Sequence, residues 1–241
     1  MQKVFITGGA RRLGRGLAFN YAEAGWDVAF SYFQSAKKVE DTFLEIKKYN
    51  TNVYSFRADV RNYNQMLDGF KTMIAEFGLP DLLINNAAIF PEKRSLLQLD
   101  IDDWQNVLDT NLNSVFYMSK IFASFAKSGS KIINIASIGA YEIWNGRIAY
   151  NVAKAGVIQL TKALAADLAP DIAVNSISPG AIDIEGEPAG ETIPRIAKHK
   201  TPMKRNAGVE NIFKGCLFLS DSDNFITGTD IVIDGGYSLT R

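Results

Sequence analysis

The chain has 241 residues, 47% of them hydrophobic, which is enough apolar material to bury a parallel sheet on both faces within one domain, residues 1–241. Its 26 basic and 26 acidic side chains balance, so no bulk charge favours nucleic acid or an acidic membrane surface as a partner. No apolar run approaches the length of a membrane span, no signal peptide precedes the first expected strand, and the single cysteine permits no internal disulfide, so we expect a cytoplasmic protein.

Short apolar runs alternate with longer amphipathic stretches along the chain. The apolar runs predict strands at residues 3–7, 27–32, 52–57, 81–85, 131–136, 172–178 and 230–233. The stretches between them predict helices near residues 13–25, 36–49, 63–77, 101–127, 148–168 and 208–220. This alternation is typical of an α/β fold: a doubly wound (Rossmann-type) parallel seven-stranded sheet with helices on both faces, in a single domain.

The first expected strand leads into a glycine-rich turn, Thr7-Gly8-Gly9-Ala10-Arg11-Arg12-Leu13-Gly14, before a helical pattern begins. Glycines let the backbone turn tightly and approach a pyrophosphate closely. The N-terminus of the following helix supplies free N–H groups and the positive end of a dipole. Turns need glycine for structural reasons too, but the position of this turn directly after the first strand favours a dinucleotide site.

The end of the second expected strand bears on which dinucleotide binds. An acidic residue there would bind the ribose 2′-hydroxyl of NAD, but this strand runs to Gln34 and Ser35 without one. A 2′-phosphate instead needs donors and positive charge, which Arg11 and Arg12, with Ser35 and Lys37, can supply. Two arginines in a turn can also be merely solvated, yet together with the missing acid they favour NADPH as the cofactor.

An irregular segment, residues 181–204, follows Pro179-Gly180 and is rich in glycine and proline. Long irregular connections in compact domains are usually lids or binding loops. Open α/β sheets bind ligands beyond the carboxyl ends of their strands. We therefore interpret residues 181–204 as a loop that covers the substrate.

Tyr150 and Lys154 are four residues apart within an expected helix, so they lie on one helix face. A nearby ammonium group lowers the pKa of a phenol, which suits a proton donor acting near neutral pH. Ser137 ends an apolar strand and can donate a hydrogen bond to developing charge on a substrate oxygen. A lone Tyr-x3-Lys pattern is more often an ordinary surface pair, and its combination with the glycine-rich turn is what favours catalysis.

These motifs, in this order, resemble those of the short-chain dehydrogenase/reductase family over essentially the whole chain. Arg12 stands where the family has the middle glycine of its first motif, and Asn85-Asn86-Ala87-Ala88 is similar to the family's Asn-Asn-Ala-Gly motif. The resemblance implies a catalytic tetrad in which Asn111 anchors a relay water: Asn111, Ser137, Tyr150 and Lys154. It also implies cofactor contacts, with Asp59-Val60 at the adenine, from Gly8, Arg11, Arg12, Leu13, Gly14, Ser35, Asp59, Val60, Asn86, Ala87, Tyr150, Lys154, Pro179 and Gly180.

Within the family the chain looks most like pteridine reductases, on the segments 12–15, 31–35 and 234–241. That likeness implies that Phe90 stacks on a flat substrate and that Arg241 reaches a neighbouring subunit's active site, giving a substrate site formed by Phe90, Ser137, Tyr150 and Arg241. The chain departs from pteridine reductases at three positions, where they carry Asp, Ser and Arg and this chain has Ser137, Ala88 and Gln34.

We therefore expect an NADPH-dependent reductase that transfers hydride to a C=O or C=N carbon of a small molecule. A pteridine is the first substrate hypothesis, and a ketone such as a 3-oxoacyl thioester is the alternative. A non-catalytic dinucleotide-binding regulatory module is the alternative of another class, and the intact tetrad argues against it. The family implies a homo-oligomer, a dimer or tetramer, formed through the helices expected at 101–127 and 148–168, and no metal is expected.

Overall fold

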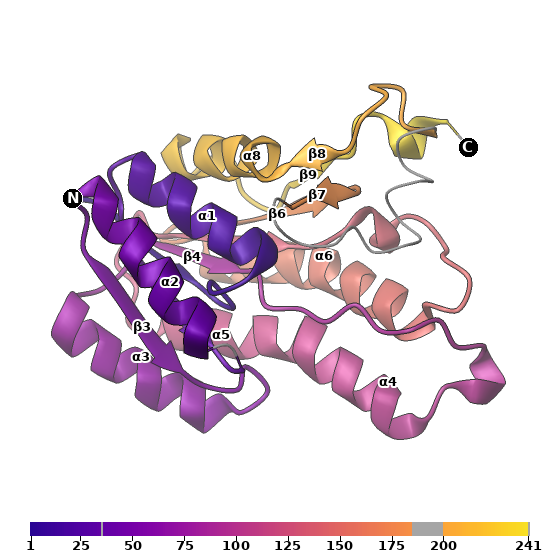
Figure 1. Cartoon of the computed structure of the whole chain (residues 1–241), viewed down its shortest axis with the longest axis horizontal. Helices are drawn as coiled ribbons and strands as arrows, with labels where there is room; N and C mark the ends of the chain where they lie inside the picture. The colour runs from indigo at the N-terminus through magenta and orange to yellow at the C-terminus, as the bar shows by residue number, and fades with distance from the viewer. Residues whose placement is uncertain (35, 185–199, 241) are drawn as a thin grey trace.

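The computed structural model describes residues 1–34, 36–184 and 200–240, and its centre is a seven-stranded sheet (Figure 1). All neighbouring strands of this sheet are parallel, in the order β3-β2-β1-β4-β5-β6-β9. The expected doubly wound fold is thus confirmed. The strands are β1 Lys3–Ile6, β2 Asp27–Tyr32, β3 Val53–Arg57, β4 Leu82–Asn85, β5 Lys131–Ile135, β6 Ala173–Pro179 and β9 Asp230–Ile233.

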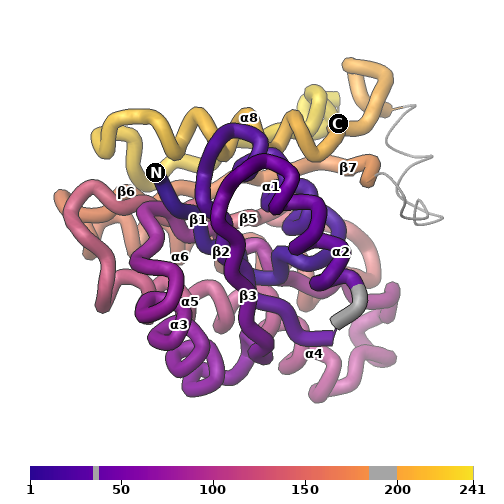
Figure 2. The backbone as a smooth tube through the Cα atoms, turned by 60° about the vertical axis from the view of Figure 1, so that its left-hand side comes forward, coloured from indigo at the N-terminus to yellow at the C-terminus, as the bar shows by residue number. Residues whose placement is uncertain are grey.

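Helices cover both faces of the sheet (Figures 1 and 2). One face packs against α1 Arg12–Glu23, α2 Ala36–Ile46 and α8 Val209–Asp221. The other face packs against α3 Tyr63–Phe77, α5 Ser114–Ala123 and α6 Ile148–Leu168. In the described part of the chain, no helix combines the length and the apolar character needed to cross a membrane.

The central strand β1 shows why helices must cover both faces. Val4, Phe5 and Ile6 have no exposed surface, and successive side chains of a strand point to opposite faces. Val4 and Ile6 join the core under α1, whereas Phe5 joins the core under α3 and α5. Each face of this strand is therefore shielded from solvent only when a layer of helices packs on it.

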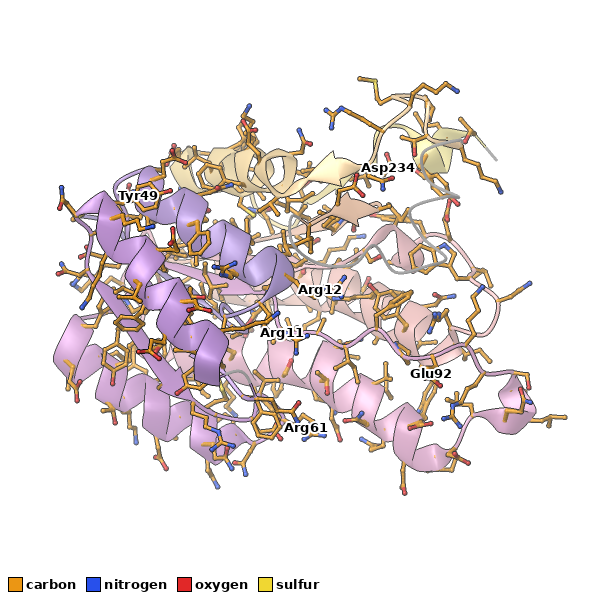
Figure 3. The ribbon with its side chains drawn as sticks, viewed as in Figure 1. Arg11, Arg12, Tyr49, Arg61, Glu92 and Asp234 are labelled. Carbon is orange, nitrogen blue, oxygen red and sulfur yellow. The ribbon has the colours of Figure 1, made fainter. Side chains whose placement is uncertain are left out.

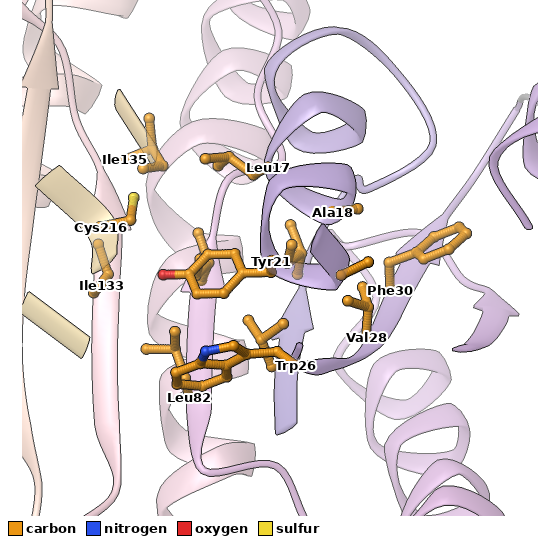
Figure 4. Close-up of a cluster of buried hydrophobic side chains, with 14 of the residues drawn as sticks. Leu17, Ala18, Tyr21, Trp26, Val28, Phe30, Leu82, Ile133, Ile135 and Cys216 are labelled. Atoms are coloured by element: carbon orange, nitrogen blue, oxygen red, sulfur yellow. The ribbon is translucent and has the colours of Figure 1, made fainter. Parts of the chain in front are cut away.

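The core under α1 contains two large aromatic side chains, Tyr21 and Trp26 (Figure 4). Their rings meet edge to face, with centroids 5.2 Å apart. The Tyr21 hydroxyl lies 2.8 Å from Oγ of Ser220, so its polar group has a partner inside the core. Cys216 is fully buried in the same cluster.

The helix expected over 101–127 differs from the observed chain. It is divided into α4 Ile101–Leu108, a π-helical turn Asp109–Asn113, and α5, and it ends at Ala123. Polar side chains within the turn bond locally, since Ser114 Oγ donates to the Thr110 carbonyl at 2.6 Å. Such π turns occur frequently at functional sites, and this one carries Asn111.

Several short elements complete the described chain, and one of them modifies the expected loop. Ile182–Asp183 forms strand β7, which pairs in parallel with β8, Ala207–Gly208, so residues 181–204 are not irregular throughout. Residues 185–199 of that expected loop lie outside the described residues. The remaining short helices are Lys47–Tyr49, Leu96–Gln98, Ile138–Ala140 and Tyr237–Leu239.

A buried polar network joins the sheet to α5 and α6. Asn85 Nδ2 donates to Asn134 Oδ1 at 2.9 Å and to Ser119 Oγ at 3.1 Å. Asn134 Nδ2 in turn donates to Thr161 Oγ1 at 2.9 Å. Because all four side chains are buried, the network fixes both helices to the strands that lead into the site.

We expect Asn134→Ala to lower the free energy of unfolding by about 1–3 kcal/mol, because it leaves buried donors and acceptors without partners. Urea unfolding followed by circular dichroism measures the change. Asn64→Ala, on the exposed face of α3, is the control and should change stability by less than about 0.5 kcal/mol. Equal stability of the two variants would show that the network contributes nothing.

Candidate active site

A large cleft lies beyond the carboxyl ends of the strands, with a volume of about 1560 Å³. This exceeds the roughly 300–1,000 Å³ of a typical small-molecule pocket, so a dinucleotide and a second molecule can share it. Figure 3 shows Arg11 and Arg12 at the start of α1, on the side of the molecule where Arg61 and Glu92 also lie. The cleft is lined by most of the residues predicted to bind cofactor or substrate: Gly8, Arg11, Arg12, Leu13, Gly14, Asp59, Val60, Asn86, Ala87, Phe90, Ser137, Tyr150, Lys154, Pro179 and Gly180.

The glycine-rich turn forms one end of the cleft. Gly8 has a φ of +67°, which favours glycine, and a Cβ at Gly14 would lie 2.4 Å from the Gly8 carbonyl oxygen. No side chain caps the start of α1, and its first turn holds no acidic residue. The N–H groups of this turn and its positive dipole end therefore suit a phosphate group.

Arg12 occupies a backbone conformation that glycine normally takes. Its φ is +49°, in the left-handed region, which costs about 1–2 kcal/mol for a residue with a Cβ. Arg11 and Arg12 are both exposed and both line the cleft. Phosphate binding by Ser35 and Lys37 stays a prediction, because Ser35 and the Lys37 side chain lie outside what the structure describes.

The ends of β1 and β4 are tied together at the floor of the cleft. Thr7 Oγ1 accepts hydrogen bonds from the backbone N–H groups of Asn86 and Ala87, each at 3.0 Å. Asn86 Nδ2 donates to the Thr7 carbonyl at 2.9 Å. The Asn86 amide therefore braces the glycine-rich turn, while Ala87 presents backbone to the cleft.

Asp59, predicted to contact the adenine, lies on the cleft wall with its carboxylate bound by Arg61. Arg61 Nη2 donates to Asp59 Oδ2 at 2.6 Å, and Arg61 Nη1 donates to Asn106 at 2.7 Å. Hydrogen bonding by Arg61 lowers the pKa of Asp59. The carboxylate is thus held ionised, with both of its oxygens accepting hydrogen bonds from Arg61.

Tyr150 and Lys154 lie together on α6, as the sequence predicts. The Lys154 ammonium is 6.0 Å from the centroid of the Tyr150 ring and donates to the Ile135 carbonyl at 2.7 Å. Burial lowers the pKa of Lys154 to about 8. The Lys154 ammonium therefore has further N–H donors for a ligand, but burial makes its charged form less stable than it would be in water.

The pKa of Tyr150 differs from the expectation drawn from Lys154. Burial raises the pKa of this phenol, while hydrogen bonding by Ser137 and the positive charge of Arg147 lower it. The cation that acts on Tyr150 in this structure is therefore Arg147. The physical reason is the geometry of Lys154, whose ammonium is buried and directed at a backbone carbonyl.

Asn111 is fully buried, and its side-chain amide bonds to the backbone of one residue. Its Oδ1 accepts from the Ile89 N–H at 2.8 Å, and its Nδ2 donates to the Ile89 carbonyl at 2.9 Å. The π turn thereby holds the segment that carries Phe90. Anchoring of a relay water by Asn111 stays a prediction, and the structure adds this positioning role.

Aromatic rings form the wall beside Tyr150. The Phe90 ring meets Tyr150 edge to face at 4.9 Å, and the Trp144 ring lies parallel to Tyr150 at 6.0 Å. Phe90 is 44% exposed, so its ring is available to a ligand. Trp144 and Arg147 were missed by the sequence reasoning, although the three-residue spacing between Arg147 and Tyr150 was a usable signal.

The remaining sequence predictions concern Gly180, Arg241 and a metal site. Gly180 follows β6, and a Cβ there would lie 2.9 Å from Cα of Asp234, so the close approach at the cleft explains the glycine. Arg241, predicted to enter a partner's site, lies outside the described residues. Across the described ranges, no group of three or more His, Cys, Asp or Glu side chains could hold a metal ion.

Known proteins resemble the chain over nearly its whole length. A family model described as enoyl-(acyl carrier protein) reductase matches residues 8–238. A 3-oxoacyl-[acyl-carrier-protein] reductase of Buchnera aphidicola is 36% identical over 239 residues, covering 96% of this chain and 95% of its own length.

Solved structures agree with these relatives. A short-chain dehydrogenase/reductase from Serratia marcescens superposes with a TM-score of 0.92 at 31% identity, over 98% of each chain. A short-chain dehydrogenase from Burkholderia cenocepacia, solved in complex with NADP, has a TM-score of 0.92 at 28% identity and covers 98% of each chain.

We expect Ser137→Ala to move the basic limb of the pH–rate profile to higher pH. Activity that uses Tyr150 as an acid falls as the pH rises through its pKa, and loss of the Ser137 hydrogen bond raises that pKa further. The rate itself should fall roughly 10²–10³-fold, as when one donor to a developing oxyanion is removed.

Ser178→Ala is the matched control, because its buried hydroxyl has no hydrogen-bond partner in the described parts of the chain and does not line the cleft. A basic limb that stays in place in Ser137→Ala would contradict the proposed interaction with Tyr150.

Proposed function

This chain belongs to the short-chain dehydrogenase/reductase family, and on that basis we propose that it is an NADPH-dependent reductase of a carbonyl substrate. One observation carries the proposal: a single cleft contains both the glycine-rich turn at the start of α1 and the side chains of Ser137, Tyr150 and Lys154. The relatives' names favour a 3-oxoacyl thioester as the substrate class. Cytoplasmic location stays a prediction.

The residues of the cleft fit NADPH. The close approach at Gly8 and Gly14 and the uncapped start of α1 suit the pyrophosphate, and Arg11 and Arg12 suit the 2′-phosphate. The end of β2 carries no acid that would repel this phosphate. A solved relative contains NADP, which supports the same cofactor here. When bound, NADPH supplies hydride.

The chain's own side chains handle the proton. Tyr150 donates its phenolic proton to the substrate oxygen, and Ser137 donates a hydrogen bond that stabilises charge developing there. The remaining N–H groups of Lys154 are available to the nicotinamide ribose, since among the described residues only the Ile135 carbonyl accepts a hydrogen bond from this ammonium. Arg147 favours the phenolate that remains after the transfer.

Pteridine reduction is the second candidate, and the aromatic wall is what favours it. Phe90 and Trp144 offer rings on which a flat heteroaromatic substrate could stack. The acid that would protonate a ring nitrogen is replaced by Ser137, and the relatives' names support carbonyl reduction better. A non-catalytic module has no need of Tyr150 and Lys154 together.

Assembly into a homo-oligomer is also part of the proposal. Apolar side chains on α5 and α6 remain exposed, namely Phe116, Ile148 and Val152. α6 carries Tyr150 and Lys154, so packing across it in a dimer or tetramer would stabilise the site. Sedimentation velocity on the wild-type protein and on Phe116→Glu tests this, and a wild-type monomer would contradict it.

We expect Tyr150→Phe to lower kcat by roughly 10²–10⁴-fold while NADPH affinity stays within threefold, because the change removes the proton donor and little volume. NADPH oxidation is followed by absorbance with acetoacetyl thioesters, simple ketones and dihydropteridines. Tyr49→Phe is the control, because Tyr49 does not line the cleft and lies away from Arg11 and Arg12 in Figure 3. A Tyr150→Phe variant that keeps more than a tenth of the activity would refute the assignment, and turnover of dihydropteridines alone would favour the second candidate.

We expect NADPH to be preferred over NADH, with the preference reduced roughly 10- to 150-fold in Arg12→Gly, as charge-assisted hydrogen bonds contribute about 1.5–3 kcal/mol. Glycine accepts the positive φ of this position, so the melting temperature should not fall. Arg11→Ala should act in the same direction, and Lys71→Ala on exposed α3 is the control. Equal kcat/KM for the two cofactors in the wild type would contradict the role of the arginines.

A further inference from the structure

Arg147 is a cation at the substrate end of the cleft that the proposed chemistry leaves without a binding partner. It directly precedes α6 and lies three residues before Tyr150, on the same side of the helix. Its guanidinium carbon is 4.2 Å from the centroid of the Phe90 ring. Arg147 lines both the large cleft and an adjoining cavity of about 400 Å³, so it stands at the boundary between them.

The guanidinium of Arg147 has unused donors. Its Nε and Nη1 atoms are shielded from solvent, yet they make no hydrogen bond with any residue that the structure describes. Arginine stays charged in proteins, and buried polar groups are nearly always hydrogen-bonded. These donors therefore need an acceptor that the described chain does not provide.

Nearby groups compensate the positive charge of Arg147 only in part. Burial lowers the pKa of Arg147, and the nearby Glu92 and Tyr150 oppose that effect. Glu92 is exposed and forms no ion pair with Arg147 within 4.0 Å across the described residues. The contact with the Phe90 face is a cation–π interaction, which satisfies charge but accepts no hydrogen bond.

We propose that Arg147 binds a carboxylate of the substrate, so that the site prefers oxo acids over neutral ketones or esters. This inference rests on the proposed carbonyl reduction. The Arg147 guanidinium carbon is 4.2 Å from the centroid of the Phe90 ring, and that centroid is 4.9 Å from the centroid of the Tyr150 ring, so the carboxylate lies within a few bonds of the carbonyl that Tyr150 protonates. A planar guanidinium suits a carboxylate because it can donate two parallel hydrogen bonds.

The surrounding side chains define the rest of the substrate. Phe90 and Trp144 provide an apolar wall next to Tyr150, so the group on the other side of the carbonyl is apolar or aromatic. A thioester has no negative charge at the position of Arg147. The inference thus keeps the proposed carbonyl reduction but replaces the oxoacyl thioester, which the relatives' names favour, by an oxo acid with a free carboxylate.

Matched substrates test the inference directly. We expect wild-type kcat/KM to be at least tenfold higher for benzoylformate than for methyl benzoylformate, and for acetoacetate than for methyl acetoacetate. Arg147→Gln should raise KM for the acids at least tenfold while KM for the esters stays within threefold of wild type, and Arg147→Lys should retain part of the acid preference. Because the Arg147 charge also lowers the pKa of Tyr150, kcat should change by a similar factor for acids and for esters. An equal rise in KM for acids and esters would show a purely structural role, and a wild-type preference for the esters would overturn the proposal.

A binding measurement separates this inference from the proposed reaction. Calorimetric titration of the wild-type protein with benzoate should show binding that benzamide does not show. Arg147→Gln should abolish it, whereas Glu92→Gln should leave it unchanged or tighter. If ketones are reduced but benzoate does not bind, the inference is wrong and the reductase proposal stands. If benzoate binds through Arg147 but no carbonyl compound is reduced, the reductase proposal is wrong. Equal weakening by Glu92→Gln and Arg147→Gln would also overturn the inference.

Discussion

The site depends on one topological constraint, the reversal of strand order at the boundary between β1 and β4. Successive strands run outward from β1 to β3 on one side and from β4 to β9 on the other. The connections after β1 and β4 therefore diverge and leave a crevice beyond their carboxyl ends. Thr7 and Asn86 hold the two strand ends together at the floor of that crevice, so the opening forms in the connections rather than in the sheet.

Burial sets the protonation behaviour of the side chains proposed to be catalytic, and it does so at a cost in free energy. Desolvation raises the pKa of Tyr150 and lowers that of Lys154 to about 8, so burial disfavours the charged form of each group. Only specific partners oppose this, namely the Ser137 hydroxyl and the Arg147 charge on the phenol. The rigid network around Asn134 supports the strand and helix on which these groups stand.

The sequence predicted the sheet well because central strands such as β1 and β4 contain continuous apolar runs, Val4–Ile6 and Leu82–Ile84, which have few other structural solutions. It failed over 101–127, since hydrophobic periodicity does not reveal that Asn111 would insert a π turn to bond with Ile89, a residue distant in sequence. The nearness of Tyr150 and Lys154 was predictable from their spacing on one helix, and the catalytic role of the tetrad stays a prediction. Arg147 was not chosen, because only three-dimensional burial distinguishes an unpartnered arginine from an ordinary solvated one.

The double hydrogen bond from Asn111 to Ile89 has a consequence for substrate range. It fixes the backbone next to Phe90 to the helical layer of α4 and α5 rather than to the sheet. The width of the substrate site is therefore set by the position of these helices. Asn111 holds the Phe90 segment at a fixed distance from them without contacting the substrate itself. Replacing Phe90 would alter the lining of the slot, whereas a slip of the π turn by one residue would move the whole wall.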